Sequence, residues 1–245
     1  MPVTRLLEHE RNKYISYDPE AHRYTYKPDN KIFRGITGWI DSFSKEPFIA
    51  SEVAERVIKN PNGEYYGWTP EDVIAFWNNL KEYGDDIHLS IENVVNYGEY
   101  PEHETFQGHV DSFYKIMDDN HIEPIVSEFV VYNEDLERAT PIDVIGVRDD
   151  KLIIVDVKTF RKGMEFLSYQ NRTFKYPLGD LYESKYEKVS LQTSIPKRWL
   201  IDKYGFKESD FGVAYTLVIN DDTTELIETM DYSDDYVPLM YEFND

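Results

Sequence analysis

The spacing of hydrophobic and polar residues changes near residue 125. Before it, after two short alternating pieces, apolar residues recur at helical spacing in three segments, 49–60, 70–84 and 85–98. After it, apolar and β-branched residues gather in short runs typical of strands, at 125–132, 142–147, 151–159, 211–219 and 224–230. The pattern predicts an α/β fold in which a mixed β-sheet core is flanked by helices, with a helical N-terminal portion.

We expect residues 1–124 to form an N-terminal flap and a helical region, and residues 125–245 to form the sheet core, the two together making one compact unit. Thr69 is a suitable N-cap for the helical segment that follows it, and Gly98 is a suitable stop. Gly84 lies between them and predicts a break or a bend. A helical segment over 180–205 contains Pro196, which predicts an interruption because proline has no backbone N–H to donate.

Composition narrows the class of protein. The chain of 245 residues is 15% aromatic, which is enough to bury a sizeable core, and no apolar run approaches the roughly 18 residues that span a bilayer. We therefore expect a cytoplasmic protein that does not contact a membrane. The chain has no cysteine, so carboxylates, histidine and backbone oxygens must bind any metal, and such ligands favour Mg²⁺ or Mn²⁺.

The formal net charge of −21 argues at first against nucleic acid, because nucleic-acid binders normally present a basic surface. The charge is unevenly distributed, however. Residues 221–245 contain nine acids and no lysine or arginine, whereas residues 156–207 contain eleven basic residues against six acids. Charges act mainly within a Debye length of about 8 Å. The net charge of the chain therefore does not exclude a polyanionic substrate that binds near the basic stretch.

The stretch "PIDVIGVRDDKLIIVDVKTF", residues 141–160, contains the strongest candidate chemistry. It reads as two short strands joined by an Asp-Asp turn, with Asp143 on the first and Asp156 on the second. Lys158 shares a face with Asp156, while Val157 points the other way and leaves its carbonyl near the same edge. Two carboxylates and a carbonyl form a hard-oxygen site for a divalent ion. The alternative is an ordinary hairpin with solvated charges.

Two features of the context favour the metal site. Asp156 follows the apolar run "LIIV", and an acid at the end of a buried strand needs a partner or a metal to offset its desolvation. Upstream, His88 and Glu92 lie four residues apart on one helix face, beside Ile87 and Ile91, which can anchor that helix on the core. The alternative for the histidine and glutamate is a satisfied surface pair.

With these motifs in order, the sequence resembles the PD-(D/E)XK nuclease superfamily, in particular its RecB-like branch of phage, viral and mitochondrial-maintenance-type DNA exonucleases. "PID" at 141–143 and "DVKT" at 156–159 match its signature, and "GDDIHLSIE" matches its "G-x-x-x-H-x-x-x-E" helix. "YYGWTPEDVIAFW" resembles the stretch before that helix in phage members, and "SLQTSIPKRW" is similar to its "Q-x-x-x-Y" helix, with Pro196 in place of the tyrosine. The resemblance covers residues 35–205.

The resemblance implies the role of each site residue. Asp143 and Asp156 bind the metal, His88 is an additional ligand, and Lys158 assists the attacking water. A second set acts around them: Glu128 is an acid one strand earlier, Gln192 holds the active site or the DNA end, and Glu92 orients His88 or a basic residue. The implied protein is an intracellular, phage-type Mg²⁺- or Mn²⁺-dependent deoxyribonuclease acting on single-stranded DNA ends or flaps.

Basic and aromatic residues after the hairpin support a nucleic-acid substrate. Four cations can bind successive phosphates of a nucleic-acid backbone, and aromatic residues that include Phe160 and Phe174 can stack on its bases. The four cations are Arg161, Lys162, Arg172 and Lys175. The alternative is a solvated loop with aromatic residues in the core.

A second hypothesis is a non-catalytic protein of the same fold, whose acidic surface imitates DNA or docks on a basic replication or recombination protein. The acidic segment 221–245 would then be the contact; otherwise it serves solubility or keeps non-specific DNA out. A degenerate site has no reason to keep the lysine and the metal-ligand positions, which favours the enzyme.

Overall fold

The computed structural model describes residues 1–245 except 19–20, 22, 47, 161–171, 221–222 and 245. Its centre is a five-stranded mixed sheet in the order β4-β5-β6-β7-β8, in which only the β6–β7 pair is parallel. The strands are β4 (Glu123–Asn133), β5 (Arg138–Arg148), β6 (Lys151–Thr159), β7 (Tyr215–Ile219) and β8 (Thr224–Glu228). The predicted α/β fold with a helix-flanked mixed sheet is confirmed.

The β5–β6 hairpin forms as its sequence predicts. Asp149 and Asp150 have φ values of 52° and 61°, the left-handed pair that a two-residue hairpin turn requires. The apolar run Leu152–Val155 is buried on both faces of the sheet. Strand β6 therefore brings Asp156 to the sheet interior at its carboxyl end.

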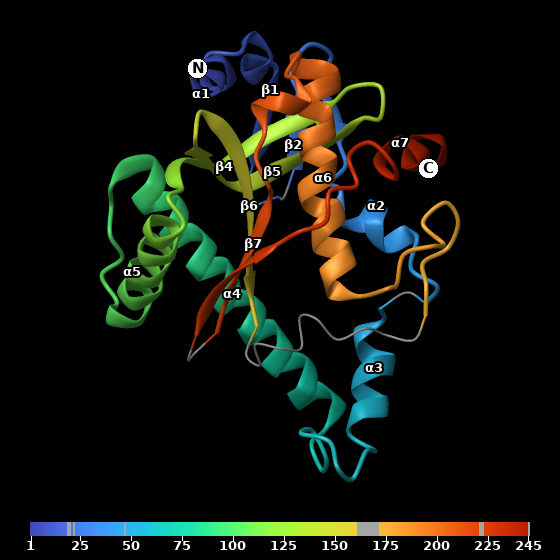
Figure 1. Cartoon of the computed structure of the whole chain (residues 1–245). Helices are drawn as coiled ribbons and strands as arrows, with labels where there is room; N and C mark the ends of the chain where they lie inside the picture. The colour runs from blue at the N-terminus through green and yellow to red at the C-terminus, as the bar shows by residue number, and fades with distance from the viewer. Residues whose placement is uncertain (19–20, 22, 47, 161–171, 221–222, 245) are drawn as a thin grey trace.

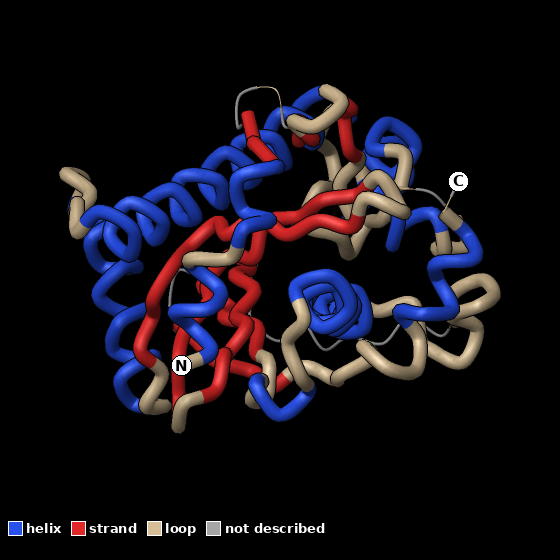
Figure 2. Tube along the Cα trace, turned by 90° about the horizontal axis from the view of Figure 1, so that it is seen from above, coloured by secondary structure: helices blue, strands red, loops and turns tan. Residues whose placement is uncertain are grey.

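Helices cover both faces of this sheet (Figures 1 and 2). Helices α4 (Pro70–Tyr97) and α5 (Glu104–Asp119) pack Ile87, Ile91 and Phe113 against Val155 and Val157 on one face. Helix α6 (Lys185–Tyr204) packs on the other face. Helix α5 is absent from the predicted elements, although Val110, Phe113 and Met117 repeat at helical spacing along it.

Helix α4 begins and ends where its sequence predicts, but it does not break at Gly84. Thr69 and Asp72 form a capping box at its start, and Gly98 ends it with a φ of 72°. A Cβ at position 84 would lie 2.7 Å from the Thr159 hydroxyl oxygen, closer than real Cβ atoms approach such a group. Gly84 is therefore a point of close contact between α4 and the end of β6, and the predicted break is wrong.

Helix α6 also runs without interruption through Pro196, so the predicted interruption is wrong. The proline deletes one helical hydrogen bond, the one that would reach the Gln192 carbonyl. The surrounding turns offset this loss because Ile195, Trp199 and Leu200 are completely buried against the sheet. Tertiary packing overrides the local preference of the proline.

The N-terminal region adds a small antiparallel sheet beside β4 and β5. Its strands are β1 (Ile15–Asp18), β2 (Arg23–Tyr26) and β3 (Lys31–Phe33), the last of which is not among the predicted elements. A bridge from Arg34 to Arg138 joins it to the start of β5. The short helices of this region are α1 (Pro2–Leu7), η1 (Glu10–Tyr14), α2 (Thr37–Ser42) and α3 (Ala50–Val57). One core cluster combines Leu6 and Trp39 of this region with Ile145 and Trp199 of the other.

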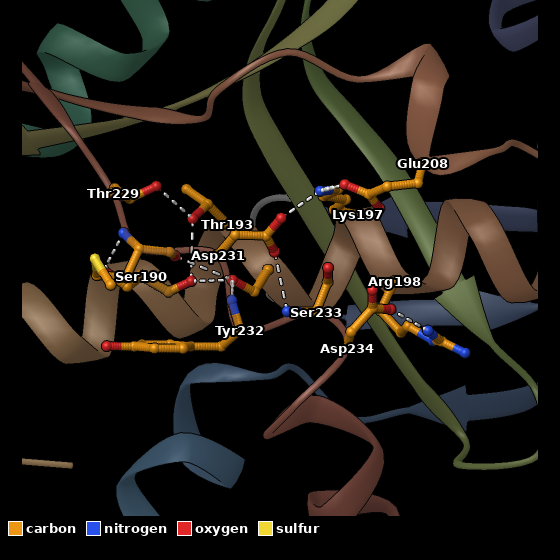
Figure 3. A network of polar contacts seen from close by, with 12 residues as sticks. Ser190, Thr193, Lys197, Arg198, Glu208, Thr229, Asp231, Tyr232, Ser233 and Asp234 are labelled. Atoms are coloured by element: carbon orange, nitrogen blue, oxygen red, sulfur yellow. Dashed lines mark hydrogen bonds and ion pairs between the residues drawn. The ribbon is translucent and has the colours of Figure 1, made fainter.

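The acidic C-terminal segment packs along α6 as Figure 3 shows. Asp231 pairs with Lys197, and an Asp234 carboxylate oxygen lies 2.6 Å from the Arg198 guanidinium. Tyr232 and Met240 are buried. The short elements of this part are η3 (Glu208–Asp210), α7 (Val237–Met240) and η4 (Tyr241–Phe243). Across the described ranges, no helix combines the length and the apolar character needed to span a membrane.

Candidate metal centre and active site

Three predicted site residues from three elements meet at the carboxyl end of β6. The Nδ1 atom of His88, on α4, lies 3.7 Å from a Glu128 carboxylate oxygen on β4 and 3.9 Å from an Asp143 carboxylate oxygen on β5. One ligand atom from each residue falls within 4.8 Å of the other two. All three side chains are half-buried. In the part of the chain that the structure describes, this is the group of acids and histidine with metal-ligand spacing.

Glu128 reaches this point through an unusual backbone conformation. In the strand register Ser127 lies opposite Val144 and Phe129 opposite Ile142, so Glu128 is opposite Asp143. Its φ is 54°, in the left-handed region that non-glycine residues rarely occupy inside a strand. Such a conformation costs of order 1–3 kcal/mol and is concentrated at functional sites. Two carboxylates are thus held side by side at a cost in backbone strain.

Asn96 fixes the strand next to this strained residue. Its side-chain amide donates to the Ser127 carbonyl at 3.1 Å and accepts from the Ser127 N–H at 2.9 Å, replacing a strand partner. The Ser127 hydroxyl then donates to the Asp143 carbonyl at 2.5 Å. Since Asn96 and His88 lie two turns apart on α4, one helix positions the histidine and both carboxylate strands. Sequence reasoning missed Asn96 and Ser127, because neither belongs to a motif.

The end of β6 supplies the remaining predicted groups. The Asp143 carboxylate accepts the Val157 N–H at 2.7 Å. The Lys158 ammonium donates to the Asp156 carboxylate at 2.7 Å and to the Val157 carbonyl at 3.3 Å. Thr216 on β7 lies opposite Asp156, with its hydroxyl 3.5 Å from that carboxylate. Asp156 therefore faces Lys158 and lies outside the His88 group, whereas the Asp143 carboxylate connects the two.

Burial and charge shift the acid–base properties of these groups. Burial above all, together with nearby Asp143, raises the pKa of Asp156 to about 6 against the lowering effect of Lys158. Burial lowers the pKa of His88, but Asp143 and Glu128 outweigh it, so the pKa is raised overall. The pKa of Lys158 is also raised, because Asp156 and Asp143 outweigh its burial. The site therefore favours positive charge.

The site opens into a cleft of about 260 Å³ between the small N-terminal sheet and α6. His88, Asp143, Asp156 and Lys158 line its floor, and Gln192 lines its α6 wall. Pro196, one turn beyond Gln192, lies on the same wall, so the continuous helix presents both residues to the cleft. Further lining residues include Tyr17, Tyr24, Thr140, Pro141 and Thr193.

Glu92 lies near this site without joining it. Burial, and next the charge of Glu128, raise its pKa. The described contacts do not link Glu92 to the His88 ring.

The predicted DNA-contact residues have mixed outcomes. Arg161 and Lys162 lie outside the described residues. Arg172 pairs with Glu46 at 3.1 Å and Glu183 at 2.8 Å, so two acids already engage its guanidinium. Lys175 is exposed, and its ammonium lies 3.4 Å from the Ser42 carbonyl.

The aromatic neighbours of these cations belong largely to the core. Phe174 is only 1% exposed, so its predicted stacking on a base is wrong. Phe160 packs against Val189 and Val218, with the Lys185 ammonium over its ring. Core burial decided the role of Phe174, a feature that its aromatic character alone does not reveal.

No protein-family model matches this chain, and no curated protein matches it.

Proposed function

We propose that this protein is a Mg²⁺- or Mn²⁺-dependent deoxyribonuclease, related to the RecB-like branch of the PD-(D/E)XK superfamily. One observation supports this most: four separate elements bring His88, Asp143, Asp156, Lys158 and Gln192 to one cleft. A fifth element, β4, brings Glu128 within metal-ligand spacing of His88 and Asp143. An ordinary surface ion pair needs only two neighbouring side chains in solvent, so it does not require side chains from several elements to meet at one place.

The donor set fits a divalent metal ion. His88, Glu128 and Asp143 would hold it, with Asp156 and the Val157 carbonyl adjoining. Oxygen-rich ligands with one imidazole suit Mn²⁺ and Mg²⁺. When bound, the ion supplies Lewis acidity and makes a coordinated water more acidic. The crowded carboxylates support a cation here because positive charge offsets their mutual repulsion.

The chain's own residues then carry out phosphodiester hydrolysis. The ammonium of Lys158, held by Asp156 and the Val157 carbonyl, orients the attacking water and stabilises charge on the phosphate oxygens. The water oxygen bonds to phosphorus as the phosphorus–oxygen bond of the leaving nucleotide breaks. The attacking water releases a proton to bulk solvent, and the leaving alkoxide takes a proton from bulk solvent. Gln192 binds the DNA backbone from the opposite wall. The partner is DNA, with single-stranded ends or flaps as the substrate.

The test uses end-labelled single- and double-stranded DNA with Mg²⁺, Mn²⁺ or chelator. Wild-type protein should cleave only with metal, and Lys158→Ala and Asp156→Ala should not cleave. Lys115→Ala is the matched control, since Lys115 is exposed on α5 and pairs only with its helix neighbour Asp119 among the described contacts. Cleavage that persists in chelator or in both cleft variants would overturn the proposal.

The alternative is a non-catalytic DNA mimic that uses the acidic C-terminal segment. Asp231 and Asp234 of this segment pair with Lys197 and Arg198, which reduces the charge available to a partner. Metal binding without cleavage of any DNA would favour this alternative over the enzyme.

A further inference from the structure

A pair of stacked tyrosines lines the cleft beside the candidate metal ligands. Tyr17 on β1 and Tyr24 on β2 are opposite each other in the strand register. Their ring centroids lie 4.7 Å apart, with 19° between the ring planes. Tyr24 is the buried member and Tyr17 is half-buried, and both line the cleft. The small sheet thus presents a flat aromatic wall to the site.

The acids near this wall determine which part of a nucleotide can approach it. Tyr17 lies close enough to Glu128 and Asp85 for both to raise the pKa of its phenol, after burial as the largest cause. Burial also raises the pKa of Tyr24, with contributions from Tyr17, Glu128 and Asp143. The rings therefore stay neutral, and nearby negative charge repels phosphate. An uncharged base meets no such repulsion and gains from stacking.

The dimensions of the cleft select one unpaired base. About 260 Å³ is slightly below the range of pockets that bind drug-sized ligands, so the cleft has room for a single base but not for stacked base pairs. Lys158 on the floor offers a positive charge for phosphate, and the tyrosine wall offers an aromatic face for a base. Different residues of one cleft can therefore bind the phosphate and the base of a nucleotide.

We propose that the Tyr17–Tyr24 stack is a base-binding platform: an unpaired base adjoining the scissile phosphate stacks on Tyr17, and the platform positions that phosphate at the carboxylates. This inference rests on the proposed nuclease function. Tyr17 is a specificity-determining residue in this scheme, because a base inside a duplex cannot reach its ring.

The small sheet provides a matched control. Tyr26 stacks on Phe33 with centroids 5.0 Å apart and 16° between the planes, a geometry close to that of Tyr17 and Tyr24. Tyr26 is not among the described residues that line the cleft. Tyr26→Leu therefore disturbs an equivalent stack in the same sheet without touching the proposed platform.

The experiment measures binding without turnover. The Asp156→Asn protein, which keeps the cleft's shape and should not cleave, is titrated with fluorescent single-stranded oligonucleotides. An abasic unit replaces each nucleotide in turn, and every oligonucleotide is also tested against Tyr17→Leu, Tyr17→Phe and Tyr26→Leu in the same background. Circular dichroism and thermal melting of each variant report whether it is folded.

We expect Tyr17→Leu to weaken binding on the order of tenfold, the usual value of one base–aromatic stack, while Tyr17→Phe and Tyr26→Leu change it less than about twofold. At one position, the abasic unit should cost the same tenfold with Tyr17 present and nothing with Tyr17→Leu, since the two changes remove one contact. Additive losses at every position, or absence of DNA binding, would overturn the platform.

The outcomes separate this proposal from the nuclease proposal. Coupling between Tyr17 and one base without cleavage by the wild-type protein keeps the platform and rejects hydrolysis. Cleavage by the wild-type protein without such coupling keeps hydrolysis and rejects the platform.

Discussion

Helix α6 borders two polar clusters that use charge in opposite ways. In the cleft, Asp143 and Asp156 lie close to His88 and Lys158, and Glu128 lies beside His88. On the side facing the C-terminal segment lies a second cluster, the C-terminal clamp, most of which Figure 3 labels. The clamp comprises Ser190, Thr193, Ser194, Lys197, Glu208, Thr229, Asp231 and Tyr232. In the clamp, Lys197 bonds to both Glu208 and Asp231.

The hydroxyl groups of the clamp are as well satisfied as its charges. The Ser194 hydroxyl donates to the Ser190 carbonyl at 2.6 Å and accepts the Tyr232 N–H at 2.8 Å. The Ser190 hydroxyl accepts the Met230 N–H at 3.1 Å. Paired polar groups of this kind stabilise a fold, whereas crowded like charges and a left-handed Glu128 destabilise it. The cleft thus holds groups that lower stability, which is typical of functional sites, whereas the clamp holds groups that raise it.

Substitutions in the two clusters should differ most in their effect on the rate of DNA cleavage. Lys158→Ala should lower the cleavage rate by about 10²- to 10⁴-fold, because it removes a charged group at the reacting phosphate. Lys197→Met, in the clamp, should leave the rate of folded protein within about twofold. Single-turnover cleavage of labelled DNA measures both. An equal loss of cleavage rate in the two variants would show that the cleft contributes no more to catalysis than the clamp does.

The free energy of unfolding should instead depend strongly on the clamp. Lys197 is only 5% exposed, and Lys197→Met leaves Glu208 and Asp231 without their shared partner, so we expect a loss of about 2 kcal/mol in the free energy of unfolding. Lys115→Met on α5 should leave the free energy of unfolding nearly unchanged, as its ion pair is exposed. Urea unfolding followed by circular dichroism compares them. An unchanged midpoint for Lys197→Met would remove the clamp's structural role.

The pH dependence of stability in chelator should also differ between the clusters. Because the pKa of Asp156 is raised to about 6 when folded, its protonated form stabilises the fold below pH 4, and that contribution, of about 2 kcal/mol, is lost as pH rises to 6. Lys197 holds the pKa of Asp231 below its usual value against the opposing effect of burial, so stability from that acid is lost as pH falls below 4.

Two variants isolate these contributions. Asp156→Asn should flatten the decline between pH 4 and 6, and Asp231→Asn should flatten the loss at lower pH. Thermal melting across pH 3–7 gives both curves. Identical curves for wild-type protein and Asp156→Asn would mean that the folded chain does not raise the pKa of Asp156.

The smallest effect concerns backbone strain. Glu128→Gly should raise the free energy of unfolding by about 1 kcal/mol, since glycine adopts the φ of 54° freely, and it should lower cleavage by removing a candidate ligand. His121→Gly is the control, because exposed His121 has a φ of 56° after α5 and lies outside the cleft lining. It should gain similar stability and keep activity. A loss of stability in Glu128→Gly would contradict the assignment of strain.

The local features of the fold were predictable from the sequence, and the tertiary ones were not. Period-2 spacing and the Asp-Asp turn predict the β5–β6 hairpin, and the capping residues predict the ends of α4. Pro196 inside α6 and Gly84 inside α4 mislead because packing, rather than intrinsic preference, decides whether a helix continues. The left-handed Glu128 and the Asn96 contact to Ser127 depend on a neighbouring element, so no local pattern encodes them.

The candidate site divides in the same way. The order of Asp143, Asp156 and Lys158 along the hairpin already predicts that they lie together, and the structure places them at one edge. His88 and Glu128 come near Asp143 only because α4 and β4 pack there. The spacing also predicts that Asp156 shares a face with Lys158, as observed. That Asp156 lies outside the His88 group depends on side-chain geometry, which residue spacing does not specify.

The contact at Gly84 limits which sequences can keep this cleft. Helix α4 carries His88 one turn beyond Gly84 and Asn96 three turns beyond it, and the hydrogen atom at position 84 rests against Thr159 at the end of β6. A Cβ at position 84 requires either the Thr159 side chain or the helix that carries His88 and Asn96 to shift, although residue 84 performs no chemistry itself. The residues allowed at positions 84 and 159 therefore depend on each other. This packing restricts the sequence at two positions that are not candidate metal ligands.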